Sequence, residues 1–211
     1  MGEKRKGRIT AAEHMAQLRS DPEWVRQQEK RDAHFRDVEA RFKAEENPLT
    51  TDLAEAGVRV LPSLASRLES GDMNSQDRIV PHSVWDLVNS KESYSAAIPI
   101  LLKHLRRPYH PVIRDGIARA LTVPETRGAT AREILETLKR EEKKEQTDGL
   151  PRGDVRWALA NALTIVGDES MAEEIKSLIA DSNYADVYNR LTDALKHCER
   201  LAKHRSGRRG G

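Results

Sequence analysis

A phrase of ten residues occurs three times in the second half of this 211-residue chain. Each copy spaces its apolar residues as one face of a helix would and ends in Ala-Leu; the copies are residues 112–121, 154–163 and 186–195. A phrase that recurs in this way is typical of stacked helical units, which bury apolar residues mainly against their neighbours. The repetition therefore predicts an all-α architecture, and it constrains form more than chemistry.

An apolar stretch that can form a partner helix precedes each copy. Residues 96–105 are followed by a turn at 106–111, which predicts two antiparallel helices ending at Leu121. The other expected pairs are 131–138 with 155–166 and 172–179 with 187–195. Removing an insertion of about ten residues from the third unit gives a common period in the low thirties.

A degenerate first unit is expected between residues 48 and 88. Its apolar residues fall on one helical face that is broken or kinked near Gly57 and Pro62. These residues are Leu53, Val60, Leu61, Leu64, Ala65 and Leu68. The insertion at 139–153 is too charged to be buried, and it is either an extension of the preceding helix or a mobile loop.

The clearest of these pairs resemble HEAT-type repeats. The resemblance is carried by Ile98-Pro-Ile-Leu-Leu-Lys-His-Leu105 with residues 112–121, and by residues 154–168, which open with Asp-Val-Arg and close with Val-Gly-Asp. It covers residues from about 50 to 198, within an expected repeat domain of residues 48–198. It implies a right-handed α-α superhelix, a solenoid of about four helix pairs whose second helices line a concave groove. It implies binding and no particular reaction.

The fourth unit departs from its neighbours at two positions. Tyr188 stands where they have Arg114 and Arg156, and Arg190 stands where they have small residues. A bulky side chain in place of Gly or Ala predicts looser packing, which is expected of a terminal unit facing solvent.

The N-terminal part has a different composition. Residues 1–10 are basic and without periodicity, which predicts disorder. Residues 11–47 are rich in helix formers, and Ser20-Asp-Pro-Glu23 predicts a short helix followed by a longer one that ends at Asn47-Pro48. This N-terminal helical extension either caps the first unit or forms a free coiled-coil arm.

The C-terminal residues 199–211 are expected to form a disordered basic tail. The formal net charge of the whole chain is only +2, so there is no general signature of a nucleic-acid-binding protein. The tail still offers contacts to phosphates, through Arg200, Lys203, Arg205, Arg208 and Arg209. Such binding would be non-specific and would weaken as salt rises.

Aligning the three phrases places polar residues in rows across the expected groove. The candidate binding residues are Arg114, Asp115, Arg119, Arg156, Trp157, Asn161, Tyr188, Asn189 and Asp193. Arg114 and Arg156 occupy the position of the usual arginine of HEAT repeats, which the resemblance associates with an inter-repeat hydrogen-bond ladder. Trp157 is either an anchor for a partner, since tryptophan is enriched in binding hot spots, or packs beneath the charged insertion.

The sequence contains no phrase associated with a catalytic, metal or cofactor site. Its seven histidines form no metal-binding pair, glycine-rich phosphate loops are missing, and Cys198 is the only cysteine. Neither a secretory signal nor a membrane-spanning run is found. We therefore expect a cytoplasmic protein that is not an enzyme and needs no metal or cofactor.

The leading functional hypothesis is a scaffold or adaptor that binds a protein or peptide partner in the groove of the second helices. The alternative is a HEAT-like protein associated with nucleic acid through its basic ends. The repeat predicts the scaffold in both cases, and the outward residues of the phrase predict where the scaffold binds.

Overall fold

The computed structural model describes residues 10–74, 77–90, 92–143 and 153–209. Within these residues the chain is all-α, with ten α-helices and no strand; a single β-bridge joins Val60 and Ile79. The chain divides into two units, residues 1–42 and 43–211. The predicted all-α class is therefore confirmed for the described residues.

The first unit contains α1 (Ala11–Ser20) and the beginning of α2 (Pro22–Glu55). A capping box starts α1: the Thr10 side chain accepts from the Glu13 N–H, and the Glu13 carboxylate accepts from the Thr10 N–H. Asp21 accepts from the N–H of Glu23 at the start of α2. A short helix followed by a longer one was expected here, whereas the predicted disorder of 1–10 lies almost wholly outside the described residues.

The expected helix end at Asn47-Pro48 is wrong, because α2 continues to Glu55 and contains Pro48. A proline inside a helix costs about 3 kcal/mol. Leu49 and Leu53 follow it and are fully buried, and each such side chain contributes about 1.5–3 kcal/mol. Burial in the second unit thus offsets the cost of the proline, and the boundary between the units falls within a continuous helix.

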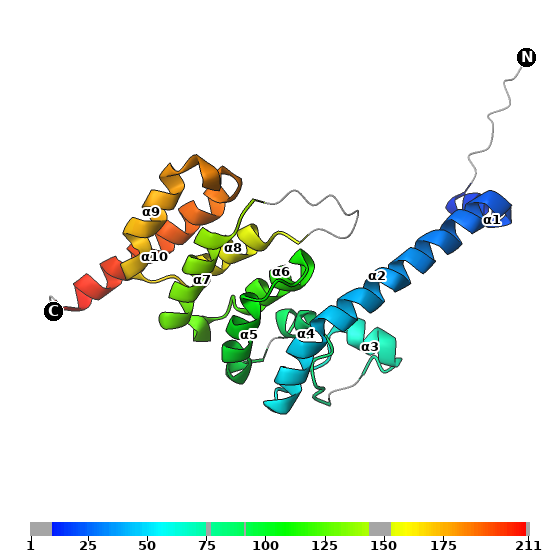
Figure 1. Ribbon diagram of the computed structural model, residues 1–211, viewed down its shortest axis with the longest axis horizontal. Coiled ribbons are helices and arrows are strands. Elements are labelled where there is room, and N and C mark those ends of the chain that lie inside the picture. Colours follow the sequence, from blue (N-terminus) through cyan, green and yellow to red (C-terminus); the bar gives the residue numbers. More distant parts are fainter. Residues whose placement is uncertain (1–9, 75–76, 91, 144–152, 210–211) are drawn as a thin grey trace, which may run out of the picture. The chain divides into compact units, whose positions relative to one another are not determined.

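The second unit contains three complete helix pairs, which follow one another in chain order (Figure 1). The pairs are α5 (Ile98–Leu105) with α6 (Pro111–Ala120), α7 (Ala129–Arg140) with α8 (Val155–Val166), and α9 (Ala172–Ala180) with α10 (Tyr188–Arg209). The two helices of each pair contact each other, and the second helices are also in contact from α6 to α8 and from α8 to α10. Short 3-10 turns accompany them: η1 (Ser95–Ala97), η2 (Pro124–Thr126), η3 (Glu169–Met171) and η4 (Ser182–Val187).

The repeated apolar letters of the phrase form the core of this unit. Ile117, Leu159 and Leu191 occupy the same position in the three copies, and all three are fully buried. Of the closing leucines, Leu121 and Leu163 are fully buried, whereas Leu195 is only partly buried. The repetition in sequence is therefore a repetition of buried contacts on α6, α8 and α10.

The region between α2 and α5 is interrupted near Gly57 and Pro62, as the sequence predicted, but its residues do not share one helical face. Gly57 follows α2 with φ of 70°, a left-handed conformation that ends helices. Val60 then lies in the β-bridge to Ile79 rather than in a helix. The short α3 (Leu64–Ser70) exposes Leu64 and Leu68, which the pattern placed inward.

The helix α4 (Val84–Val88) takes the place of a second helix in this degenerate unit and contacts α6. Its first N–H donates to the buried carboxylate of Glu46 on α2, at 2.6 Å. Gly116 of α6 approaches it so closely that an added Cβ would lie 2.5 Å from a methyl group of Val84. The small residue of the phrase thus faces the preceding helix, α4.

The predicted disorder of the C-terminal tail is wrong for residues 199–209, because α10 continues to Arg209. Cys198 is fully buried and lies against Gly167, and Leu201 is partly buried one turn later. Arg205 forms an ion pair with Glu169 of η3. These contacts hold a segment of good helix formers to the unit, so its high charge does not unfold it.

The insertion is only partly described. Helix α7 includes the first two residues of the insertion, Lys139 and Arg140, and ends there, because residues 141–143 are not helical. Residues 144–152 lie outside the described residues. After them Gly153 packs against the start of α6, where an added Cβ would lie 2.2 Å from the Pro111 carbonyl oxygen.

Candidate binding face

Arg114 of α6 is held by the residue that follows α7. Its two terminal nitrogens donate to the two carboxylate oxygens of Glu141, at 2.7 and 2.5 Å. The side chain is 17% exposed. A bidentate charge-assisted pair of this kind fixes the guanidinium group, and here it ties one helix pair to the next.

Arg156 of α8 occupies the same position one unit later. Its donors reach Asp186 at 2.9 and 3.1 Å, the Asn183 carbonyl at 2.7 Å and the Glu141 carbonyl at 2.6 Å. The guanidinium also lies 4.8 Å from the centre of the Tyr184 ring. The residue is buried, so its donors serve contacts between helix pairs and not a ligand.

Trp157, the next residue, faces a different environment. The Asp154 side chain caps α8 by accepting from the Trp157 N–H at 2.9 Å. The indole ring is partly buried against the core. Two guanidinium groups lie over it: that of Arg119 from α6 at 5.0 Å and that of Arg190 from α10 at 5.7 Å. Both distances are within the range of a cation–π interaction.

We call Arg119, Trp157, Asn161 and Arg190 the Trp157 cluster. The two arginine side chains are 37% and 36% exposed. A hydrogen bond of 3.5 Å links Arg190 to the Asn161 side chain. The cluster therefore presents two partly exposed guanidinium groups, one from each of the helices beside α8. Both lie over the same aromatic ring.

The carboxylates beside the cluster are already engaged. Asp115 is buried and accepts from the Arg119 Nε at 3.0 Å, four residues along the same helix. Burial raises its pKa, while the hydrogen bond from Arg119 lowers it. Asp193 lies 3.6 Å from both Arg190 and Lys196. Arg119 is therefore paired with one carboxylate that is mostly hidden from solvent.

More basic side chains lie at the other end of α8. Arg127 donates weakly to the Ile165 carbonyl near the end of this helix, at 3.4 Å. Arg200 of α10 approaches the His197 Nδ1 at 3.0 Å. Burial, followed by the nearby charges of Arg200 and Arg127, lowers the pKa of His197. The two arginines thus flank the C-terminal end of α8 much as Arg119 and Arg190 flank its beginning.

The sequence prediction named nine candidate residues for the groove, and the structure separates them. Arg114 and Arg156 join helix pairs, and Asp115 is buried. Arg119, Trp157, Asn161 and Asp193 belong to the cluster or adjoin it. Tyr188 and Asn189 are exposed in the first turn of α10 and are not among the described contacts of the cluster.

Arg190 is the residue that the prediction missed. Its row, Gly116 and Ala158 in the other copies, suggested looser packing. Gly116 contacts the preceding second helix, α4, so the equivalent position on α10 faces α8. A long side chain there reaches over Trp157 rather than opening a gap. Arg190 could have been identified from the small residues Gly116 and Ala158 at the same position, because small residues in a repeat indicate the side that faces the neighbouring helix.

A second polar network is centred on the buried ring of His104. The His104 ring has no exposed surface; it contacts the Asp52 carboxylate at 2.7 Å and the Tyr109 hydroxyl at 2.6 Å. Burial lowers the pKa of His104, and hydrogen bonds from Lys103 and His104 lower the pKa of Asp52 to about 2. Because a substrate cannot reach the ring, this network braces α2 against α5 rather than carrying out chemistry.

The part of the chain that the structure describes offers neither an accessible thiol nor a metal site. Burial raises the pKa of the Cys198 thiol to about 11, which keeps it protonated and unreactive at neutral pH. Within the described part of the chain, no group of three His, Cys, Asp or Glu side chains could hold a metal ion. None of the helices found there is both long and apolar enough to cross a membrane.

Comparisons of the chain with protein-family models, with curated proteins and with solved structures found no match. The Trp157 cluster places two guanidinium groups over one indole ring, with contributions from three helices.

Proposed function

We propose that this chain is a non-enzymatic scaffold of the HEAT-repeat type, which binds a protein partner through the face formed by α6, α8 and α10. The face carries the Trp157 cluster at the beginning of α8. In this proposal the helix pairs form a solenoid, and their second helices form the concave binding surface.

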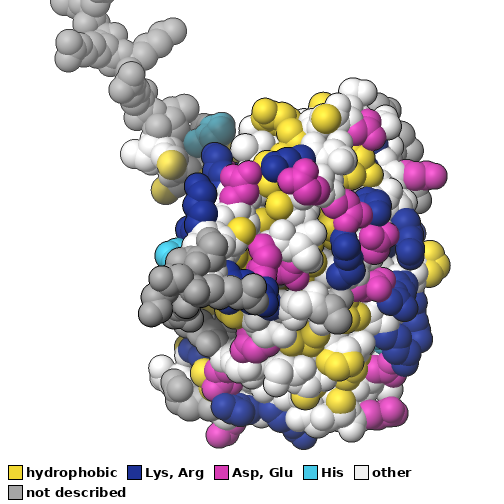
Figure 2. All heavy atoms as spheres, turned by 90° about the vertical axis from the view of Figure 1, so that its left-hand side faces the viewer, with side chains coloured by type: hydrophobic (Ala, Val, Ile, Leu, Met, Phe, Trp, Pro, Cys, Tyr) yellow, Lys and Arg dark blue, Asp and Glu magenta, His cyan; other side chains and the backbone are white. Residues whose placement is uncertain are grey.

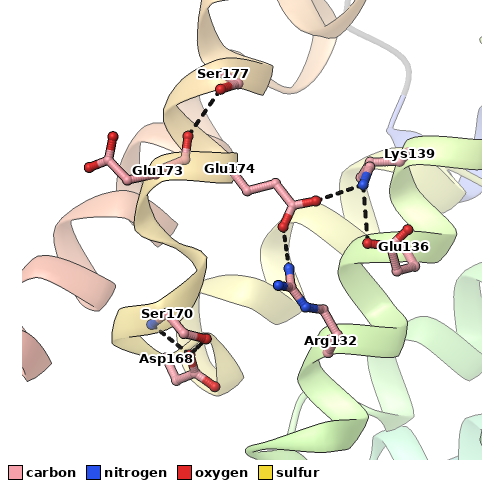
Figure 3. A network of polar contacts seen from close by, with 8 residues as sticks. All are labelled: Arg132, Glu136, Lys139, Asp168, Ser170, Glu173, Glu174 and Ser177. Atoms are coloured by element: carbon pink, nitrogen blue, oxygen red, sulfur yellow. Dashed lines mark hydrogen bonds and ion pairs between the residues drawn. The ribbon is translucent and has the colours of Figure 1, made fainter.

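Three features support the repeat assignment. The second helices contact each other in chain order from α4 through α10. Arg114 and Arg156 bond to residues of the following helix pair, as the ladder associated with HEAT repeats would require. On the layer of first helices, Glu174 of α9 accepts from Arg132 and Lys139 of α7 (Figure 3). Successive pairs are thus joined on both layers.

The observation that carries the binding proposal is the Trp157 cluster. Binding hot spots are enriched in tryptophan and arginine, which supply contact area and directed hydrogen bonds. A partly exposed indole with arginines from both neighbouring helices concentrates these groups in one place. Arginine stacked on an aromatic ring also loses less freedom when it binds, because its plane is already positioned.

Affinity capture with the full chain tests this proposal. We expect proteins retained by the wild-type chain to be lost with Trp157→Ala and kept with Arg132→Gln, a variant on the layer of α7 and α9. Circular dichroism must show that both variants keep the helical content of the wild type. Retention of every partner by Trp157→Ala, or loss of all of them with Arg132→Gln, would reject the cluster as the binding site.

The alternative, binding of nucleic acid, is favoured by one observation. Helix α10 continues past the last helix pair with Lys196, Arg200, Lys203 and Arg205 along it. The face of the molecule on the α9 and α10 side, however, interleaves basic and acidic side chains (Figure 2), which does not favour a phosphate backbone. Replacing Arg200, Lys203 and Arg205 by glutamine should abolish salt-sensitive binding to oligonucleotides if this alternative holds.

A further inference from the structure

The charges around α8 are unequal in accessibility. Arg119 and Arg190 at its beginning, and Arg127 and Arg200 at its end, are all at least partly exposed. Among the nearby carboxylates, Asp115 is buried against Arg119. The solvent-facing charge along this helix is therefore mainly positive, although the formal net charge of the chain is only +2.

The remaining acidic side chains near this face have other partners. Asp154 caps α8, and Asp186 binds Arg156. Glu169 pairs with Arg205, and Glu199 is 3.9 Å from Lys176 of α9. Asp193, 44% exposed, lies 3.6 Å from Arg190, and Glu199, 46% exposed, precedes Arg200 in the chain. An incoming carboxylate therefore competes with two acidic side chains whose own ion pairs are long, at 3.6 and 3.9 Å.

The indole ring decides between kinds of anionic partner. Nucleic-acid bases bind by stacking on open aromatic faces. Here guanidinium groups already lie over the Trp157 ring, which leaves the edges of the arginines as the recognition groups. Guanidinium edges match carboxylates, and phosphates as well, with two parallel hydrogen bonds, so the choice rests on the covered ring face. The geometry thus favours a protein carboxylate over a stacked base.

We propose that the partner bound on this face is an acidic protein segment that lies along α8, with carboxylates at the Arg119 and Arg190 pair and at the Arg127 and Arg200 pair. This inference rests on the proposed function and names the chemistry of its partner. From Trp157 to Ile165 the helix advances about 12 Å, and an extended chain covers this length in about four residues. Two acidic positions about four residues apart are therefore expected, with an apolar residue next to the second one, beside Ile165, which is 40% exposed.

Fluorescence anisotropy with the full chain and labelled peptides tests this inference. The probes are a 12-residue peptide with two Glu-Glu pairs about four residues apart, the same peptide with Gln or Lys in place of Glu, and an oligothymidine of equal length. We expect the Glu peptide to bind at least about tenfold more tightly than the Gln peptide, and the difference to shrink as salt rises.

Two double variants locate the binding. Arg119→Gln with Arg190→Gln, and Arg127→Gln with Arg200→Gln, should each weaken the Glu peptide by about fivefold to tenfold. The matched control is Arg106→Gln with Arg132→Gln, which removes the same charge from the ion pairs with Glu133 and Glu174 on α7 and α9. This control should change the affinity by less than about twofold.

A second readout does not depend on affinity. In the free chain, burial and then the charges of Arg200 and Arg127 lower the pKa of His197. A carboxylate bound near these two arginines would offset their part of the effect and raise the pKa. Titration of the His197 ring signal by NMR, with and without the Glu peptide, should show an upward shift that the Gln peptide does not produce.

Several outcomes overturn the inference. They are equal binding of the Glu and Gln peptides, no binding of the Glu peptide up to about 1 mM, an equal loss in the control variant, and oligothymidine binding that depends on the same arginines. A neutral or basic protein that requires Trp157 would overturn it while leaving the proposed function intact. The proposed function is tested separately, by partner capture with Trp157→Ala.

Discussion

Arginines on the same three helices have two different environments. Arg114 and Arg156 face carboxylates and carbonyl oxygens of the next helix pair, and most of their surface is buried. Arg119 and Arg190 face an indole ring and keep over a third of the side chain in solvent. A buried guanidinium group surrounded by acceptors holds helices together, as Arg156 does even with the Tyr184 ring 4.8 Å away, whereas one with over a third of its side chain in solvent keeps donors for another molecule.

The largest expected effect is at Arg156. Arg156→Ala should lower the free energy of unfolding by about 3 kcal/mol, since removing one partner of a buried ion pair costs ~3–5 kcal/mol and the partial exposure of Asp186 reduces this. Urea denaturation followed by circular dichroism measures it. The matched variant Arg190→Ala should cost no more than about 1 kcal/mol. Equal losses at the two positions would remove the distinction between them.

A similar comparison concerns the row that contains Gly116 and Arg190. Gly116→Ala introduces a methyl group 2.5 Å from Val84 Cγ1, and the strain should cost about 1–3 kcal/mol. The measurement is again the midpoint of urea unfolding. Wild-type stability of Gly116→Ala would mean that α4 and α6 can separate without cost, and that the row does not set the spacing of second helices.

Acidification should lower the contribution of the buried His104 and His197 side chains to the free energy of unfolding. The pKa values of His104 and His197 are lowered in the folded chain from an ordinary value of 6.5, so the unfolded chain takes up protons first. Stability from these residues is present above pH 6.5 and is lost as pH falls below it toward their folded pKa values.

The groups that face these rings set the design of the pH experiment. His104 is faced by Asp52, Lys103, Arg107 and Tyr109, and His197 by Arg127 and Arg200. We expect the loss of unfolding free energy between pH 7.5 and 5.5 to be smaller in His104→Asn and in His197→Asn than in the wild type. If both variants lose as much unfolding free energy as the wild type does, other groups cause the loss.

Much of the fold could be predicted because the same residues repeat. Ile117, Leu159 and Leu191 occupy equivalent positions in three phrases, and a buried helical face needs only such spacing. Rules that predict helix ends from nearby residues failed where burial against the rest of the unit determined how far the helix continued. Helix α2 runs through Pro48 because Leu49 and Leu53 are buried, and α10 continues because Cys198 is.

The binding face was harder to predict than the fold. Trp157 and Arg119 stand out as polar or aromatic letters on a repeated helix, and both belong to the cluster. Arg190 could not be identified in this way. Its role depends on which helix the position of Gly116, Ala158 and Arg190 faces, and that is known only once the positions of α8 and α10 are known. Arg114 and Arg156 appear equivalent to Arg119 in sequence, and only their acceptors separate them.

The smallest expected effect is the energy of the stack itself. A double-mutant cycle with Arg190→Gln and Trp157→Leu should give a coupling of about 0.5–1 kcal/mol in unfolding free energy, the range measured for exposed cation–π pairs. The four proteins are compared by urea unfolding at one pH and salt concentration. A coupling well above 2 kcal/mol would place Arg190 with Arg156, as a residue that holds helices together. A small coupling combined with a large loss of partner binding would separate the two kinds of arginine, because the donors of Arg190 would then contribute more to recognition than to folding.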